Sequence, residues 1–215
     1  MKLGQILDDF KNSLLGEKNF FKKLKKEKSI YKGFSYFTVL TVIVLIITGY
    51  RYLESLNELL FNIYKITGLE ELAVQIDITP SIYISFIVIT TILSISLAFL
   101  RYYLVHISLL LFKKNLAYKD TYNSLCYSVT PGYIGMASLG LAFLSFIFTL
   151  NWLGWFFTSI WLFFELYSIY IRSRGIALTH GVSWFKGFLT IYILSTLLML
   201  ILLIPIYIIL LVILI

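Results

Sequence analysis

Long runs of apolar residues with almost no charge constrain this chain more than any other feature. A helix needs roughly 20 mostly apolar residues to cross a bilayer. Inside lipid, each spanning segment must satisfy its own backbone hydrogen bonds, which favours helices. The sequence therefore predicts an all-α polytopic membrane protein, a bundle of five transmembrane helices. The five predicted spans are residues 34–50, 82–106, 124–149, 152–171 and 187–215.

The composition agrees with a chain that is mostly dissolved in lipid. Of its 215 residues, 60% are hydrophobic and 13% are charged, whereas a soluble domain is about half apolar and a quarter charged. Cys126 is the single cysteine, so no disulfide can form within the chain. The first 33 residues lack the apolar stretch of a cleaved signal peptide. We expect the first span to act as the insertion signal.

The charges between the spans predict the orientation. Residues 1–33 contain nine lysines, and the loops after the second and fourth spans are also basic. Residues 51–80 are instead rich in Asp and Glu. Because Lys and Arg are kept on the cytoplasmic side, the N-terminus is predicted inside and the C-terminus outside.

Two amphipathic segments flank the first predicted span. Residues 1–33 form a predicted cytoplasmic basic arm, with apolar residues at helical spacing followed by a lysine-rich run that contains Lys22, Lys23, Lys25 and Lys26. Such a segment binds anionic lipid headgroups or a partner, or serves only as a topological anchor. Lipid accounts for the charge, so no nucleic acid partner is expected. The external segment 51–80 is predicted to lie on the outer surface or to continue the first span.

A helix-breaking sequence interrupts the third span. Pro131 and Gly132 follow several residues of helical character, so the span either begins at Pro131 or begins near residue 123 and kinks there. Lipid does not tolerate unpaired backbone groups, and the Ser128 and Thr130 hydroxyls are placed to satisfy them. Small residues that follow, such as Gly132 and Gly135, predict close helix packing.

The stretch "TYNSLCYSVTPGYIG" resembles the Tyr-Ser-x-x-Pro segment of the Ypt/Rab-interacting protein family, the YIP domain, through Tyr127, Ser128 and Pro131. The segments "GEKNFFKKLKKEKSIYKGFSYF" and "YSIYIRSRGIALTHGVSWFKGFLTI" are also similar, and the resemblance covers roughly residues 17–215. It implies a prokaryotic-type, five-span membrane protein with a cytoplasmic N-terminus, from a family linked in eukaryotes to vesicle trafficking. The Asp-Leu-Tyr-Gly-Pro element of eukaryotic members has no match, so GTPase binding is not expected.

Charged residues interrupt two predicted spans. Arg101 lies in the second span and Glu165 in the fourth, and counting the helical rise places them at similar depths. We predict an intramembrane polar cluster of Arg101, Tyr127, Ser128 and Glu165 in the inner half of the bundle, which His106 could join. Arg101 could instead extend to the interface, form a structural ion pair, or line a transport path.

Enzyme chemistry has no support in the sequence. No phosphate-binding loop or zinc motif occurs, and of the two histidines, His180 is expected to be exposed at a helix end. We therefore expect no catalytic residue, metal or cofactor. The predicted function is a membrane-organising or trafficking-related scaffold that binds lipids, partner membrane proteins or a second copy.

The alternative function is a small transporter or channel with Arg101 and Glu165 along its path. Transporters often have matching broken helices in two halves, but here only the third span is clearly broken and five spans do not divide equally. The expected location is a membrane, the cell membrane if the chain is prokaryotic, as its high Ile and Lys content suggests.

Overall fold

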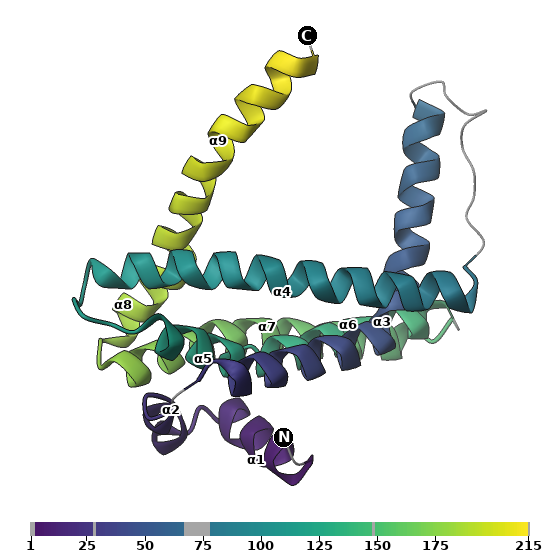
Figure 1. Cartoon of the computed structure of the whole chain (residues 1–215). Coiled ribbons are helices and arrows are strands. Elements are labelled where there is room, and N and C mark those ends of the chain that lie inside the picture. Colours follow the sequence, from purple (N-terminus) through teal and green to yellow (C-terminus); the bar gives the residue numbers. More distant parts are fainter. Residues whose placement is uncertain (1–2, 28, 67–77, 148, 215) are drawn as a thin grey trace. The chain divides into compact units, whose positions relative to one another are not determined.

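The computed structural model describes residues 3–27, 29–66, 78–147 and 149–214, and in this part of the chain helices are the only regular structure (Figure 1). Five helical segments are long and apolar enough to cross a membrane: Tyr31–Ile66, Pro80–Leu110, Tyr118–Phe146, Asn151–His180 and Trp184–Ile204. The predicted all-α chain with five membrane-spanning helices is therefore confirmed. The direction in which the helices cross remains a prediction.

Two short helices, α1 (Leu3–Leu14) and α2 (Lys18–Leu24), precede the first long helix. That helix, α3 (Tyr31–Ile66), contains the predicted first span and continues without a break through residues 51–66. The rest of the predicted external segment, residues 67–77, lies outside the described residues. α4 (Pro80–Leu110) starts with proline in the first turn, where its missing N–H costs nothing. The Thr79 hydroxyl accepts a hydrogen bond from the Ile82 amide at 3.3 Å.

The third predicted span consists of two helices, α5 (Tyr118–Ser128) and α6 (Thr130–Ile147), and a short turn leads from α6 into α7 (Asn151–His180). The Leu150 amide donates to the Ser145 carbonyl at 2.9 Å across this turn. Close packing continues along the pair, because a Cβ on Gly154 would lie 2.5 Å from the Phe146 ring. A Cβ on Gly135 would meet Phe164 at 3.3 Å. α6 and α7 therefore form a tight helical hairpin, and the close packing predicted from the small residues of the third span is present.

The last predicted span is not one regular helix. It begins as α8 (Trp184–Phe188), widens into the π-helical segment η2 (Leu189–Leu194) and ends as α9 (Ser195–Leu214). A π turn bonds each amide to the carbonyl five residues back, so carbonyls at its ends lose their usual partner. The Thr190 hydroxyl donates to the Lys186 carbonyl at 2.6 Å, and the Ser195 hydroxyl donates to the Ile191 carbonyl at 2.5 Å. Two hydroxyls thus stabilise the π segment.

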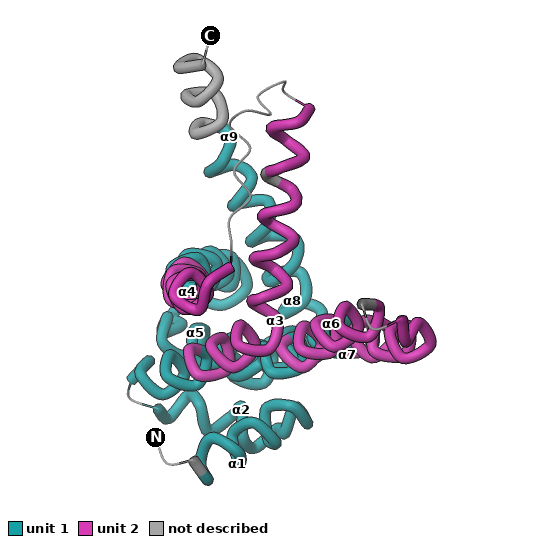
Figure 2. Tube along the Cα trace, turned by 90° about the vertical axis from the view of Figure 1, so that its right-hand side faces the viewer, with its two compact units in different colours: residues 1–37, 96–132, 165–215 teal, residues 38–95, 133–164 magenta. Residues whose placement is uncertain are grey.

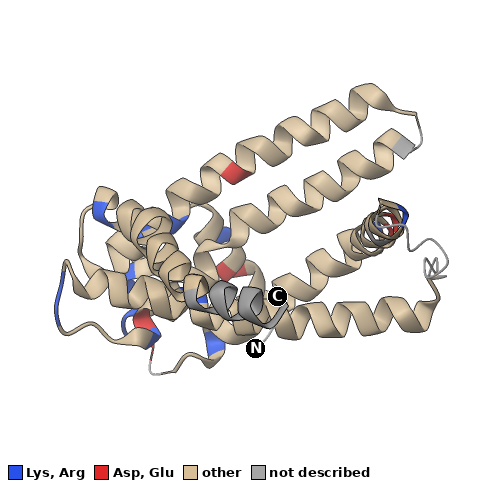
Figure 3. Ribbon diagram, turned by 90° about the horizontal axis from the view of Figure 1, so that it is seen from above, with Lys and Arg blue, Asp and Glu red and all other residues tan. Residues whose placement is uncertain are grey.

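The chain divides into two compact units, each made of discontinuous segments (Figure 2). Unit 1 comprises residues 1–37, 96–132 and 165–215, and includes the whole predicted arm. Unit 2 comprises residues 38–95 and 133–164. Every Lys and Arg of the sequence except Arg51 and Lys65 belongs to unit 1. Figure 3 shows these charges on the ribbon.

Candidate functional site

The break in the third span lies where Pro131 removes a backbone donor. In a continuous helix the amide of residue 131 would bond to the Tyr127 carbonyl, but proline has no N–H. The Thr130 hydroxyl donates to the Tyr127 carbonyl instead, at 2.8 Å. Ser128, also completely buried, donates to the Leu125 carbonyl at 3.1 Å. Hydroxyls therefore take over the backbone's hydrogen bonds at the break, with Pro131 in the first turn of α6.

The same Thr130 hydroxyl belongs to a buried hydroxyl triad that joins three distant parts of unit 1. Thr130 Oγ1 lies 2.7 Å from Ser13 Oγ on α1 and 2.7 Å from the Tyr36 hydroxyl on α3. Ser13 and Tyr36 are themselves 3.1 Å apart. We call Ser13, Tyr36 and Thr130 the hydroxyl triad. It holds the start of the arm against the helix break.

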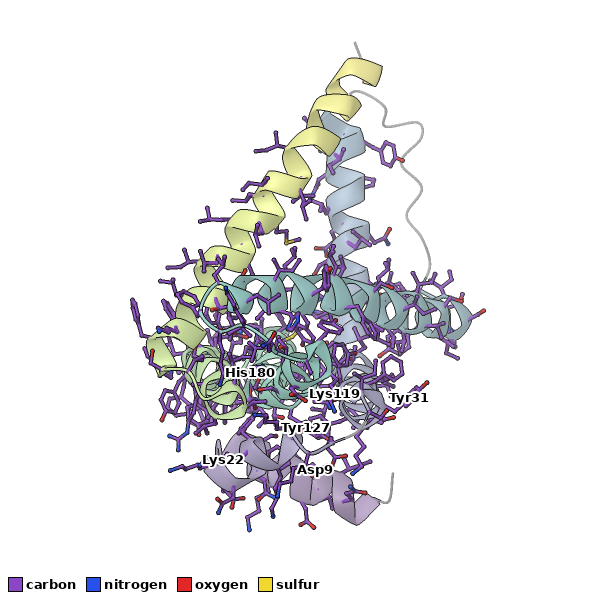
Figure 4. The ribbon with its side chains drawn as sticks, turned by 60° about the vertical axis from the view of Figure 1, so that its left-hand side comes forward. Asp9, Lys22, Tyr31, Lys119, Tyr127 and His180 are labelled. Atoms are coloured by element: carbon purple, nitrogen blue, oxygen red, sulfur yellow. The ribbon has the colours of Figure 1, made fainter. Side chains whose placement is uncertain are left out.

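Tyr127 lies next to Tyr36 of the triad and binds the arm at a second point. Figure 4 labels Tyr127 and its partner Asp9. The Tyr127 hydroxyl donates to the Asp9 carboxylate at 3.3 Å, and its ring packs on Tyr36 and Phe20. Burial raises the pKa of the Asp9 carboxyl above its ordinary value of 3.8, while the Tyr127 hydrogen bond and the charge of Lys32 oppose the rise. Desolvation of the carboxylate is the larger effect.

The predicted basic arm has a buried apolar face and an exposed face that carries its lysines. Phe21 and Leu24 on α2 are 0% and 4% exposed, and a Cβ on Gly175 of α7 would meet the Phe21 ring at 2.7 Å. The Thr179 hydroxyl donates to the Phe21 carbonyl at 3.2 Å. The lysines between and after these residues are exposed: Lys22, Lys23, Lys25 and Lys26. The apolar face of α2 is therefore packed inside the protein, and its lysines remain at the surface.

Arg101 and Glu165 do not meet Tyr127 or Ser128 in any hydrogen bond or ion pair of the described residues. Arg101 is exposed on α4, and Glu165 is half-buried on α7. Both lie within electrostatic reach of the Tyr192 hydroxyl on η2, together with Arg172 of α7. Arg101 and Glu165 therefore lie in the electrostatic surroundings of Tyr192 and Arg172, two residues outside the predicted polar cluster. Tyr192 lies in a mostly apolar stretch, where spacing gives no signal for such a contact.

Both histidines contact one threonine of α5. His106 Nδ1 and His180 Nε2 each lie 3.0 Å from Thr121 Oγ1, and the Lys113 ammonium donates to the His180 carbonyl at 2.5 Å. His180 is only 3% exposed, so its predicted exposure is wrong (Figure 4). The reason is that the end of α7 is covered by α5 and the loop after α4. These contacts tie the ends of α4, α5 and α7 together.

Unit 2 contains a separate cavity of about 550 Å³. The Thr41 and Tyr133 hydroxyls, 2.6 Å apart, lie on its wall. Its other lining residues come from α3, α4 and α6: Val44, Leu45, Tyr52, Leu56, Phe86, Thr90, Ser94 and Met136. Neither Arg101 nor Glu165 lines this cavity.

Comparison with known proteins gives one family match. The model of the Yip1 domain matches residues 11–213, nearly the whole chain. No curated protein matches the chain, and no solved structure matches it. The matched region includes the hydroxyl triad, the helix break and the π-helical segment.

Proposed function

This chain belongs to the Yip1 domain family, and from that premise we propose that it is a non-enzymatic scaffold that organises membranes by binding lipids and partner membrane proteins. It is an integral, multi-pass membrane protein. One observation carries the proposal: the arm is packed against the protein on one face and presents four exposed lysines on the other. These lysines are Lys22, Lys23, Lys25 and Lys26.

A fixed basic surface binds a membrane differently from a loose basic tail. Each Lys near an anionic surface contributes about 1 kcal/mol. Because the hydroxyl triad and Phe21 already hold the arm, little additional ordering is needed when the lysines bind. The arm is therefore suited to bind acidic headgroups or an acidic surface of a partner protein.

The proposed orientation places unit 1 charges at the cytoplasmic side, with the N-terminus inside and the C-terminus outside. Support comes from the restriction of nearly all Lys and Arg to unit 1. In a prokaryotic cell the membrane would be the cell membrane. Partners of this scaffold include anionic lipid, another membrane protein or a second copy of the chain.

The test is purification of the full chain from its own membrane in native lipid discs, followed by mass spectrometry of the co-purifying molecules. We expect a stoichiometric membrane-protein partner or enriched acidic lipid. Replacing Lys22, Lys23, Lys25 and Lys26 together by Gln should weaken this association, while Lys114→Gln, an exposed lysine outside the arm, should preserve it. A bare chain carrying only bulk lipid would contradict the scaffold.

A transporter or channel is the second candidate, favoured by the approach of Arg101 and Glu165 to the same Tyr192 hydroxyl. Its test is solute and ion flux into vesicles that contain the full chain or Glu165→Gln. Loss of flux in a folded Glu165→Gln variant would favour transport over the scaffold.

A further inference from the structure

Three helices of unit 1 bring two arginines to one tyrosine. Arg101 of α4 and Arg172 of α7 both interact electrostatically with the Tyr192 hydroxyl of η2. Along the chain these residues are widely separated, so the arrangement depends on the fold. We call Arg101, Arg172 and Tyr192, together with Ser168, the guanidinium site.

The members of the guanidinium site lie at one depth. Arg101 lies nine residues before the end of α4, Arg172 eight before the end of α7, and Tyr192 eight after the start of α8. At 1.5 Å per residue these offsets correspond to about 12–14 Å of helix. The ends of α4 and α7 are themselves joined by the Lys113–His180 hydrogen bond. Equal offsets place the three residues at a similar depth, and the electrostatic interactions of Arg101 and Arg172 with the Tyr192 hydroxyl show that they face one another.

Several buried polar atoms of this site have no hydrogen-bond partner. They are Ser168 Oγ, Arg172 Nε and the Tyr192 hydroxyl oxygen. Arg172 is close enough to interact with the Tyr192 hydroxyl, but no hydrogen bond of ordinary geometry joins them. All three groups can donate a proton, and a guanidinium can only donate. Burying such groups unpaired is costly, and a group that supplies hydrogen-bond acceptors would satisfy all three, the Arg172 Nε–H in particular.

The charge of the site also favours an anion. Arg101 and Arg172 carry two positive charges, and Glu165 supplies one negative charge nearby. The ion pairs within the described residues are Lys32–Glu27 and Arg51–Glu54, so neither arginine is directly paired with Glu165. One positive charge is left over. A phosphodiester carries one negative charge and several acceptor oxygens, which match this excess.

The backbone of α6 packs closely beside two of these donors. A Cβ on Gly132 of α6 would lie 3.0 Å from Arg172 Nη2 and 3.1 Å from Ser168 Oγ. Glycine at this position therefore lets the start of α6 lie directly against Arg172 and Ser168. The π turn of η2 changes the direction of Tyr192 relative to a regular helix, and such turns often occur at functional sites.

We infer that the guanidinium site binds the phosphate of an acidic phospholipid headgroup. Arg101 is exposed on a span that faces mostly outward, so a lipid can reach it from the bilayer. Arginine at this depth draws phosphate inward by extending its side chain and thinning the bilayer locally. Bidentate Arg–phosphate hydrogen bonds then satisfy the unpaired donors. The inference does not depend on the lysine arm.

The test is native mass spectrometry of the full chain in detergent, titrated separately with phosphatidylglycerol, phosphatidylcholine and inorganic phosphate. We expect one tightly bound phosphatidylglycerol. Arg172→Gln and Arg101→Gln should each weaken its affinity about tenfold, and Tyr192→Phe about threefold. Arg174→Gln, on the same helix, should leave the affinity unchanged. The four-lysine arm variant should also retain this lipid, which separates this test from that of the scaffold.

The outcomes decide the inference. Equal binding of both lipids that is insensitive to Arg172→Gln and Arg101→Gln would overturn it, and so would an equal loss in Arg174→Gln. If only inorganic phosphate binds at these residues, the phosphate chemistry stands but its source in the bilayer is wrong. Should Arg172→Gln fail to fold, Arg101→Gln and Tyr192→Phe still decide, because Arg101 is exposed and phenylalanine keeps the ring.

Discussion

At the scale of single residues, Thr130 replaces a donor that proline lacks. Its hydroxyl bonds to the Tyr127 carbonyl and lies within hydrogen-bond distance of Ser13 and Tyr36. Thr130→Val keeps the shape and removes the hydroxyl, so the carbonyl loses its side-chain donor. We expect the free energy of unfolding to fall by about 1–3 kcal/mol, measured by denaturant titration in micelles.

Thr158→Val is the matched control for this change. Within the described residues, the Thr158 hydroxyl donates its hydrogen bond only to the Gly154 carbonyl of its own helix. Removing the Thr158 hydroxyl should lower the free energy of unfolding by about 0.5 kcal/mol or less, as is usual for a substitution near the surface. Equal losses in the two variants would show that the hydroxyl triad adds nothing.

Asp9 gives a pH dependence with a definite sign. Burial raises the pKa of its carboxyl above 3.8, so the folded arm binds the proton more tightly than the unfolded arm. The stabilising contribution is full below the ordinary pKa and is lost as pH rises through the raised value. We expect faster hydrogen exchange of α1 amides at pH 7 than at pH 4, after correction for intrinsic exchange rates.

Asp9→Asn should abolish this pH dependence, because the amide still accepts the Tyr127 hydrogen bond but does not ionise. Asp8→Asn changes the exposed neighbour and should leave the dependence intact. A flat profile for the unaltered chain would show that Asp9 has no part in holding the arm.

At the scale of elements, the break between α5 and α6 predicts coupling between two neighbours. Pro131→Ala restores an N–H that can bond to the Tyr127 carbonyl. The cost of Thr130→Val should then fall by about 1 kcal/mol in the Pro131→Ala background, measured as a double-mutant cycle. Pro80→Ala, at the start of α4, is the control and should leave the cost of Thr130→Val unchanged. Additive effects of Thr130→Val and Pro131→Ala would contradict the coupling.

The spans themselves could be predicted because lipid leaves the backbone few choices. Apolar length identified five membrane-spanning helices, and Pro131 identified the break. The partners of the break could not be predicted, because Ser13 is 117 residues from Thr130 and lies on a short helix whose position depends on tertiary packing. Hydropathy also gave no sign of the π turn in the last span.

The polar cluster shows the same limit. Helical rise predicts the depth of Arg101 and Glu165 but does not predict how each helix is rotated about its axis. Both residues approach Tyr192, whereas Tyr127 binds Asp9. His180 was expected at a solvated helix end because sequence does not show which loop covers that end. Only the folded structure shows that α5 and Lys113 cover His180.

At the scale of the whole molecule, the orientation can be tested with introduced cysteines. Cys126 is 0% exposed and should not react with an impermeant maleimide. We expect Glu58→Cys to be labelled in intact cells, and Lys22→Cys only after lysis, because loop charge predicts that the arm faces the cytoplasm. Labelling of Lys22→Cys in intact cells would reverse the proposed orientation.

The π segment has a consequence for insertions and deletions. Six residues, Leu189–Leu194, occupy a turn that is wider than an α-helical turn. Deleting one residue there can close the wide turn into a regular α-helical turn, so the residues that follow keep the faces they present. In a regular α-helical span a deletion instead rotates the following residues by about 100°, because no widened turn absorbs it. The last span therefore contains a point where one residue can be lost while the rest of the helix keeps its orientation.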